Sequence, residues 1–336
     1  MRFAMNTIPT TFNHSLPSYT VVGGIQRAGS TGLSAVILNR GGRYPRRTFF
    51  QELEKNGFDY IVSLEGPQER YDVEDLSGRF PSVKFILLKN QISVGEQINL
   101  AVSELSSPLF FVFWNDIRIL HGGGAVKITE RLMNNPREAA EGESAGSKYK
   151  RLCTVPVIQN SQFETLPTLI SPAYYQGRLK TVPATSTKEA SVSLYPFDGV
   201  GIYDRERFIR LGGFDSTLRT SYWQLMDFGF RAWLWGEQIA CTQLVRMSYD
   251  GDIPSEDSTA EDSYKRFFLK NLAPVFRGDS AHIPLRRYPR YVMKSGDGPF
   301  EAWEEFMEAR KWVETNRYRF KQDAHTLTEL WEKPEL

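Results

Sequence analysis

The chain has 336 residues, of which 41% are hydrophobic and 24% are charged, a composition typical of a large globular α/β unit. Its net charge of +1 gives no support to a strongly basic surface for nucleic acid or for an anionic membrane. No apolar run approaches the roughly 20 residues that span a bilayer, and the first residues lack the apolar core of a signal peptide. The two cysteines, Cys153 and Cys241, lie in apolar stretches, as buried thiols do. We therefore expect a cytoplasmic protein without a transmembrane segment and without a nucleic-acid partner.

Short apolar runs alternate with helical patterns in the first third of the chain. Strands are expected at 33–38, 58–64, 83–88 and 109–114, and helices at 45–56 and 95–105. This alternation predicts an α/β fold, a mostly parallel twisted sheet flanked by helices. Ligands of such sheets bind at the carboxyl ends of the strands, which directs attention to Asn39, Glu65 and Asp116.

The second half of the chain has a less regular pattern. We expect a polar surface loop at 134–150, a strand at 152–158 and a long loop at 161–193 that covers the site. Helices are expected at 205–211 and 220–235, and the segment 300–331 has the pattern of one or two amphipathic helices.

Three segments carry candidate chemistry. The first, DYIVSLEGP at 59–67, ends an apolar strand at Glu65, whose carboxylate can accept a hydrogen bond from a nucleotide base or a ribose hydroxyl. The alternative for Glu65 is a solvated side chain at a turn. The second segment, 89–116, contains Asn99 and ends a buried strand at Asn115 and Asp116. Hard carboxylate oxygens suit Mg²⁺ or Mn²⁺, although an aspartate that simply ends a strand is also common.

The third segment, 201–239, contains the turn LGGFD at 211–215 and the helix that follows it. The two glycines permit positive φ angles and a close backbone approach. One helical turn separates Asp227 from both Gln224 and Arg231, so the three side chains share a helix face. Asp227 is either a proton acceptor in catalysis or the partner of Arg231 in an ion pair, which would stabilise the helix by roughly 0.3–0.5 kcal/mol.

In this order, the three segments resemble the family 2 glycosyltransferases, which have the glycosyltransferase A (Rossmann-like) fold, over about 33–251. The resemblance implies transfer of a sugar, with inversion, from a nucleotide-diphospho-sugar (a UDP-, GDP- or dTDP-sugar) to a glycan, lipid-linked or protein acceptor. It also implies a divalent cation, Mn²⁺ or Mg²⁺, and a nucleotide-binding half at 31–125 followed by an acceptor half at 150–252. The segments 1–30 and 253–336 are then an N-terminal and a mostly helical C-terminal extension of this 31–252 domain.

The resemblance also assigns roles to individual residues. The donor or its cofactor would be bound by Asn39, Glu65, Asn99, Asn115 and Asp116, with Asp116 as the metal ligand. The acceptor would be bound by Gly213, Phe214, Asp215 and Gln224. Asp227 would be the catalytic base that accepts the proton of the acceptor hydroxyl.

The chain departs from the family pattern at three acidic positions, which here are Trp114, Gln224 and Leu225. These departures leave open a site that works without metal. They also leave open a non-catalytic relative that binds a sugar nucleotide or a protein partner. A third alternative, a nucleotidyltransferase, would need a basic glycine-rich loop after the first strand, which 39–43 resembles faintly, but the LGGFD turn and its helix favour the glycosyltransferase.

Overall fold

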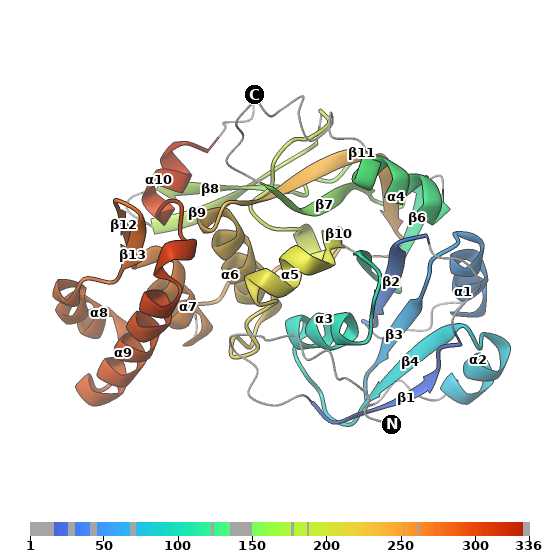
Figure 1. The fold of residues 1–336 in the computed structure, drawn as a ribbon, viewed down its shortest axis with the longest axis horizontal. Helices are drawn as coiled ribbons and strands as arrows, with labels where there is room; N and C mark the ends of the chain where they lie inside the picture. The colour runs from blue at the N-terminus through green and yellow to red at the C-terminus, as the bar shows by residue number, and fades with distance from the viewer. Residues whose placement is uncertain are drawn as a thin grey trace.

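The computed structural model describes residues 17–25, 31–40, 46–67, 72–121, 124–134, 150–175, 178–186, 188–251, 253–260 and 262–331. Their main element is a nine-stranded sheet with the order β1-β4-β3-β2-β5-β10-β7-β11-β6 (Figure 1). Its strands are β1 (Tyr19–Gly23), β2 (Leu33–Leu38), β3 (Ile61–Glu65), β4 (Val83–Leu88), β5 (Leu109–Trp114), β6 (Ile117–His121), β7 (Lys150–Gln159), β10 (Gly201–Asp204) and β11 (Glu237–Tyr249).

Most strands of this sheet run in one direction. The pairs β2–β3, β3–β4, β2–β5 and β7–β11 are parallel, and β10 lies antiparallel between β5 and β7, so that β7 again runs with β5. Only β1, β6 and β10 among the described strands run the other way. Strands β2, β3 and β5 are buried along their whole length, as the continuous apolar runs of a covered parallel sheet require. The expected mostly parallel sheet flanked by helices is confirmed.

Helices cover both faces of the sheet. They are α1 (Arg46–Lys55), α2 (Val73–Arg79), α3 (Val94–Ser103), α4 (Gly124–Asn134), α5 (Arg205–Leu211) and α6 (Ser221–Leu234). Figure 1 shows α1 and α2 on the right of strands β2, β3 and β4, with α3 on their left. Helix α3 begins with a capping box in which the Ser93 hydroxyl and the Glu96 carboxylate each accept a backbone N–H of the other residue, an arrangement that satisfies two free donors of the first turn.

Two segments are more ordered than the sequence predicts. Strand β1 lies within the predicted N-terminal extension and pairs with the sheet edge at β4. The expected long loop at 161–193 contains a hairpin, β8 (Leu169–Tyr175) and β9 (Arg178–Ala184), whose residues do not line the cavity described below. The other expected strands and helices are present, with ends within about three residues of the prediction. The expected loop at 134–150 lies almost entirely outside the described residues.

The C-terminal part of the chain packs against α6. It consists of α7 (Asp262–Phe267), a π-helical turn (Phe268–Leu272), the hairpin β12 (Val275–Arg277) and β13 (Ser280–His282), α8 (Tyr288–Ser295), α9 (Pro299–Thr315) and α10 (Ala324–Glu329). Figure 1 shows these helices gathered at the left, beside α6 and away from β1 to β4. None of the helices in the described ranges has the length and hydropathy needed to cross a bilayer.

A buried network of charges joins this C-terminal part to α6. The Lys270 ammonium lies 2.7 Å from Asp227 Oδ1 and 2.7 Å from Asp215 Oδ2. On α6 itself, Arg231 Nη2 donates to the other oxygen of Asp227 at 2.8 Å, and Arg231 also donates to the carbonyls of Leu211 and Gly213. The side chains of Asp215, Asp227 and Arg231 have no exposed surface. Because each buried carboxylate has cationic partners, the network can stay ionised inside the protein.

The π-helical turn explains how two consecutive residues reach the same carboxylate. The Ala273 N–H donates to the Phe268 carbonyl, five residues earlier, instead of four. Lys270 Nζ and Asn271 Nδ2 then both donate to Asp227 Oδ1, at 2.7 and 2.8 Å. The widened turn thus supplies Asp227 with two donors from neighbouring positions.

We predict that Lys270→Met lowers the free energy of unfolding by about 3–5 kcal/mol, because it leaves two buried carboxylates short of a positive charge. The measurement is urea unfolding followed by tryptophan fluorescence. Arg317→Met is the control, since Arg317 pairs with Glu314 on the exposed surface and its removal should change stability by less than about 1 kcal/mol. Equal losses in the two variants would contradict the proposed importance of the buried network.

Candidate functional site

The carboxyl ends of β2 and β5 place four polar residues at one edge of the sheet. Leu38 pairs with Trp114 at the ends of the two strands, so Asn39 and Arg40 leave the sheet beside Asn115 and Asp116. The turn is held by Asn115, whose backbone N–H donates to the Leu38 carbonyl and whose side-chain oxygen accepts the Arg40 N–H. This edge is where ligands of parallel sheets bind, as the sequence predicted.

Arg40 lies between two carboxylates at this edge. Its Nε is 3.2 Å from Asp116 Oδ2, and one terminal nitrogen donates to Asp198 Oδ2. The guanidinium also lies over the indole ring of Trp114, 4.0 Å from the ring centroid. Burial alone would lower the pKa of Arg40, but the charges of Asp198 and Asp116 outweigh it and raise that pKa, so the side chain stays cationic.

Asp198 is held in an unusual backbone conformation. Its φ of 56° lies in the left-handed region that few non-glycine residues adopt. Trp114 Nε1 donates to its carbonyl at 2.9 Å, and the Tyr249 hydroxyl donates to its Oδ2 at 2.8 Å. These bonds, together with the Arg40 ion pair, hold a conformation that costs free energy and that is typical of functional sites.

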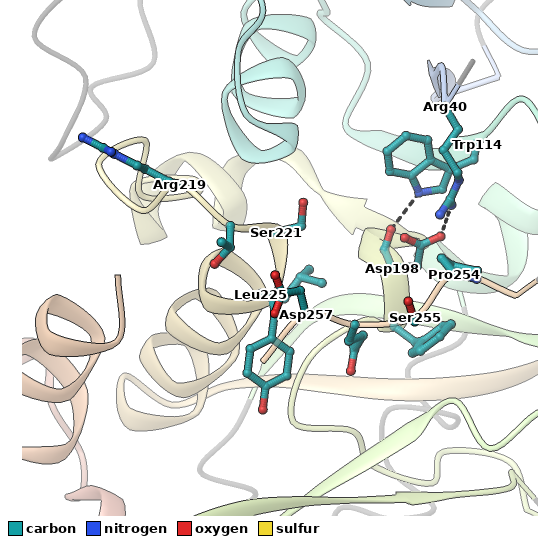
Figure 2. Close-up of a pocket in the computed structure, with 13 residues that line it drawn as sticks. Arg40, Trp114, Asp198, Arg219, Ser221, Leu225, Pro254, Ser255 and Asp257 are labelled. Carbon is teal, nitrogen blue, oxygen red and sulfur yellow. Dashed lines mark hydrogen bonds and ion pairs between the residues drawn. The ribbon is translucent and has the colours of Figure 1, made fainter. Parts of the chain in front are cut away.

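A cavity of about 360 Å³ opens beside this cluster (Figure 2). It is lined by Arg40, Trp114, Phe197, Asp198, Arg219, Thr220, Ser221, Tyr222, Leu225, Pro254, Ser255, Glu256 and Asp257. Figure 2 shows Arg40, Trp114 and Asp198 together on one side, Arg219 far from them, and Ser221 and Leu225 of α6 between. The volume lies within the range of small-ligand sites, roughly 300–1,000 Å³.

Two further acidic side chains line the cavity from the segment 253–260. Glu256 accepts a hydrogen bond from the Tyr195 hydroxyl at 2.9 Å, and its Oε1 is buried without a hydrogen-bond partner among the described residues. Burial raises the pKa of Glu256, opposed by the Tyr195 bond and assisted by the charge of Asp198. Asp257 instead accepts bonds from Thr259 of its own turn, which lower its pKa.

Glu65, predicted to bind the nucleotide base, is fully buried at the end of β3. One oxygen accepts bonds from Arg46 at 2.5 Å and from Ser63 at 2.6 Å, while Oε2 has no hydrogen-bond partner among the described residues. Burial raises the pKa of Glu65 despite the charge of Arg46. Asn39, its predicted companion, donates to the Leu64 carbonyl at 2.6 Å. Neither residue lines the cavity.

Four predicted ligand-binding residues instead connect α3 to the LGGFD turn and α6. The Asn99 amide both donates to and accepts from the backbone of Phe214, and a Cβ on Gly213 would lie 2.4 Å from Asn99 Oδ1. Gln224 accepts the Gly95 N–H at 2.9 Å and donates to Ser93 Oγ at 2.7 Å. Phe214 is buried and stacks on Phe228. The structure therefore places Asn99 and Gly213 in packing contacts, and Phe214 and Gln224 line a small second cavity of about 20 Å³ beside Leu225.

Asp215 and Asp227 lie in the buried charge network and do not line the cavity. The ion pair between Asp227 and Arg231, the alternative to a catalytic role, is present. Burial alone would raise the pKa of Asp227, but the charges of Lys270 and Arg231 outweigh it and hold that pKa well below its usual range. A fully buried carboxylate with four donors cannot accept a proton from a substrate in the cavity, so the structure gives the predicted base a structural role.

Arg40, Asp198, Arg219 and Glu256 belong to the cavity without having been predicted as site residues. Arg40 lies directly after Asn39, two positions beyond the expected strand end at Leu38, and Asp198 lies in the glycine- and aspartate-rich segment before 201. Both positions carry a local signal, a charged residue at the end of a buried run. No local pattern marks Arg219 or Glu256, which the tertiary fold brings to the cavity.

The family resemblance implies a divalent cation near Asp116. Within the described ranges, Asp116 Oδ1 is buried and has no hydrogen-bond partner, which would suit a cation ligand. However, the guanidinium of Arg40 already lies between Asp116 and Asp198, and its positive charge opposes a second cation there. No three His, Cys, Asp or Glu side chains within the described ranges are arranged to hold a metal ion. With Arg40 in this position, the residues do not fit the cation.

Comparison with known proteins gives structural similarity alone. No protein-family model matches the chain, and no curated protein matches it in sequence. The crystal structure of GalNAc-T7 with UDP, GalNAc and Mn²⁺ is similar at 13% identity and a TM-score of 0.49, over 90% of this chain and 58% of that one. The crystal structure of S. aureus TarS 1–349 with UDP-GlcNAc has 12% identity and a TM-score of 0.40, over 82% of this chain and 71% of that one. The mannosyltransferase PcManGT from Pyrobaculum calidifontis with GDP-Man and Mn²⁺ has 10% identity and a TM-score of 0.40, over 83% of this chain and 69% of that one.

The present chain thus spans less than two thirds of the GalNAc-T7 chain. Because each TM-score lies below 0.5, the function is inferred from the residues of the site.

We predict that Asp227→Asn destabilises the protein most at neutral pH. Because the folded state lowers the pKa of Asp227, its ionised form contributes stability above the unfolded value of about 3.9, and this contribution is lost as the pH falls toward the folded value. The difference in unfolding free energy between wild type and variant should therefore shrink below about pH 4. Urea unfolding across this pH range measures it, and a difference that grows toward acid pH would refute the ionised network.

Proposed function

We propose that this protein binds a nucleotide-diphospho-sugar in the cavity beside β2, β5 and α6 and transfers its sugar to an acceptor hydroxyl. The observation that carries the proposal is a cation, Arg40, at the carboxyl edge of a parallel sheet, facing a cavity that also contains aromatic, hydroxyl and carboxylate groups. A diphosphate needs positive charge and hydrogen-bond donors, and a sugar needs apolar faces together with polar groups for its hydroxyls.

The two arginines of the cavity suit the phosphates of the donor. One terminal nitrogen of Arg40 donates to Asp198, its Nε lies 3.2 Å from Asp116 Oδ2 as an ion pair, and its side chain is 25% exposed. Arg219 lies at the other side of the cavity (Figure 2). Guanidinium groups bind phosphate oxygens through paired N–H donors, so either can stabilise the charge on a departing nucleoside diphosphate.

The nucleoside part of the donor has a candidate contact near the ends of β2 and β3. Glu65 Oε2 is a buried acceptor without a partner among the described residues, a situation that costs free energy unless a ligand or water supplies a donor. The imide N–H of a pyrimidine base or a ribose hydroxyl is such a donor. This contact needs Oε2 to become accessible, because Glu65 has no exposed surface and does not line the cavity, so its nucleoside role stays a prediction.

The proton acceptor of the transfer is best sought among the cavity carboxylates. Asp198 is committed to Arg40 and Tyr249, and Asp257 to its own turn. Glu256 has one oxygen without a hydrogen-bond partner in the described part of the chain, and burial raises its pKa. Glu256 would accept the proton of the acceptor hydroxyl while the hydroxyl oxygen forms a bond to the sugar carbon. The bond between that carbon and the diphosphate breaks at the same time and leaves its electron pair on the diphosphate.

Donor binding should stabilise the folded protein. A thermal-shift screen with UDP-, GDP-, dTDP- and CMP-sugars should show one nucleotide class that raises the Tm, since a ligand at about 100 times its Kd adds about 2.7 kcal/mol. Ser221→Trp, at an exposed position on the cavity wall, should remove the shift by filling the cavity. Thr315→Trp, at the exposed end of α9, should keep it. If no nucleotide stabilises the wild type, the proposed function is refuted.

Glu256→Gln should lower kcat by about 10²–10⁴ while donor affinity stays within a few-fold of wild type, because the amide keeps the shape of the side chain but cannot accept the proton. Turnover is measured as release of nucleoside diphosphate from the donor identified in the screen. Asp257→Asn, the neighbouring acid, is the matched control and should keep most of the rate. A variant Glu256→Gln with wild-type kcat would exclude Glu256 as the base.

A second function, donor binding without transfer, is favoured by one observation. Leu225, which occupies an acidic position of the family pattern, lines the cavity, whereas the acid that remains in that pattern, Asp227, is buried. Binding of the donor without turnover by the wild type, over a panel of glycan acceptors, would support this alternative.

A further inference from the structure

We infer that Arg40 occupies a latent divalent-cation site, so that its guanidinium supplies the positive charge at this edge of the sheet and ligands bind there without metal. The inference extends the proposed function, because it specifies how the charge of a bound phosphate group is met. It rests on four described side chains: Arg40, Asp116, Asp198 and Trp114.

The two carboxylates that contact Arg40 are of the kind that bind cations. Asp116 follows β5 and Asp198 lies in the turn before β10, so two different parts of the chain bring their oxygens to one guanidinium. The side chains of Asp116 and Asp198 are only 5% and 14% exposed. Two carboxylates at one point with little access to water require a positive charge between them, which a divalent cation or an arginine can provide.

Trp114 fits the guanidinium and not a metal ion. The Arg40 guanidinium lies over its ring, 4.0 Å from the ring centroid, a contact that favours a weakly hydrated cation. Trp114 Nε1 donates to the Asp198 carbonyl and so helps to orient the aspartate that pairs with Arg40. At the position where the family pattern has an acid, this chain therefore has a residue that supports an arginine.

The charge balance leaves the carboxylates short of positive charge. Asp116 and Asp198 together carry two negative charges against one on Arg40, and Asp116 Oδ1 has no partner among the described residues. Burial raises the pKa of both carboxyls, and the opposing effect of Arg40 does not cancel it. When the guanidinium is removed, the same oxygens become free to bind Mn²⁺.

The experiment compares Mn²⁺ binding by the full chain in four forms: wild type, Arg40→Met, the double variant Arg40→Met/Asp116→Asn, and Arg118→Met. Methionine keeps the aliphatic part of the Arg40 side chain. Arg118→Met removes the same charge two residues from Asp116 but frees only the single carboxylate of Asp250, so it controls for a general gain of negative charge. The probe is Mn²⁺ alone, followed by the loss of its free electron paramagnetic resonance signal, with circular dichroism to confirm folding.

We expect submillimolar Mn²⁺ binding by Arg40→Met and none by the wild type, the double variant or Arg118→Met. Tight Mn²⁺ binding by the wild type, or no gain in a folded Arg40→Met, overturns the inference. Should Arg40→Met fail to fold, Arg40→Gln is the second variant, with the same two outcomes.

A second measurement separates this inference from the proposed function. The donor identified by thermal shift should bind the wild type equally well in EDTA and in Mn²⁺, within about twofold, and should bind Arg40→Met about 10- to 100-fold more weakly in EDTA. Donor binding by the wild type that requires Mn²⁺ overturns the inference and leaves the proposed function intact. A gain of Mn²⁺ binding in Arg40→Met without any donor binding by the wild type refutes the proposed function and leaves the cation site intact.

Discussion

Two buried carboxylates, Asp215 and Asp227, impose the constraint that organises the contact between α6 and the C-terminal segment. Neither has exposed surface, so each needs cationic partners within the fold. Arg231 supplies one charge from α6, and Lys270 brings another from the C-terminal segment. The C-terminal segment is therefore not a separate appendage but supplies charge that the central domain requires. It also fixes α6, whose other face carries Ser221 and Leu225 into the cavity.

Buried carboxylates also need a cationic partner at the carboxyl edge of the sheet, but the partner there is not enclosed by the fold. There the carboxylates of Asp116 and Asp198 are largely buried, and the balancing guanidinium of Arg40 is more exposed and faces a cavity. Trp114, Tyr249 and the backbone turn at Asp198 all serve this one arrangement. If Arg40 takes the place of a cation, as we infer, Trp114 is one part of that arrangement, because it contacts the guanidinium and orients Asp198.

The sheet and its helices could be predicted because their signals are local. The runs at 33–38, 83–88 and 109–114 coincide with β2, β4 and β5, since strands buried on both faces must be continuously apolar. The edge at which parallel sheets commonly bind ligands follows from strand direction, and Asp116 lies at that edge beside Arg40. These features need no knowledge of distant contacts.

The division of the acidic residues between structure and chemistry could not be predicted in this way. Asp227 matches a catalytic motif in sequence, but a lysine 43 positions later determines that it is buried and paired. Asn99 and Gln224 match binding positions, but they satisfy backbone groups of Phe214 and Gly95. Glu256 carries no motif and reaches the cavity through the path of 253–260. In each case the decisive partner is remote in sequence, so a short pattern contains no record of it.

The π-helical turn at Phe268–Leu272 has a consequence for how this segment tolerates changes in length. The turn holds one residue more than an α-helical turn closed by a four-residue bond, and this extra residue is what lets Lys270 and Asn271 reach the same oxygen. Deletion of a single residue here would restore the ordinary helical spacing and rotate one of the two donors away from Asp227. Relatives that keep the buried carboxylate should therefore show no one-residue gap in this turn when their sequences are aligned. Relatives that lack the carboxylate can lose the extra residue of the turn.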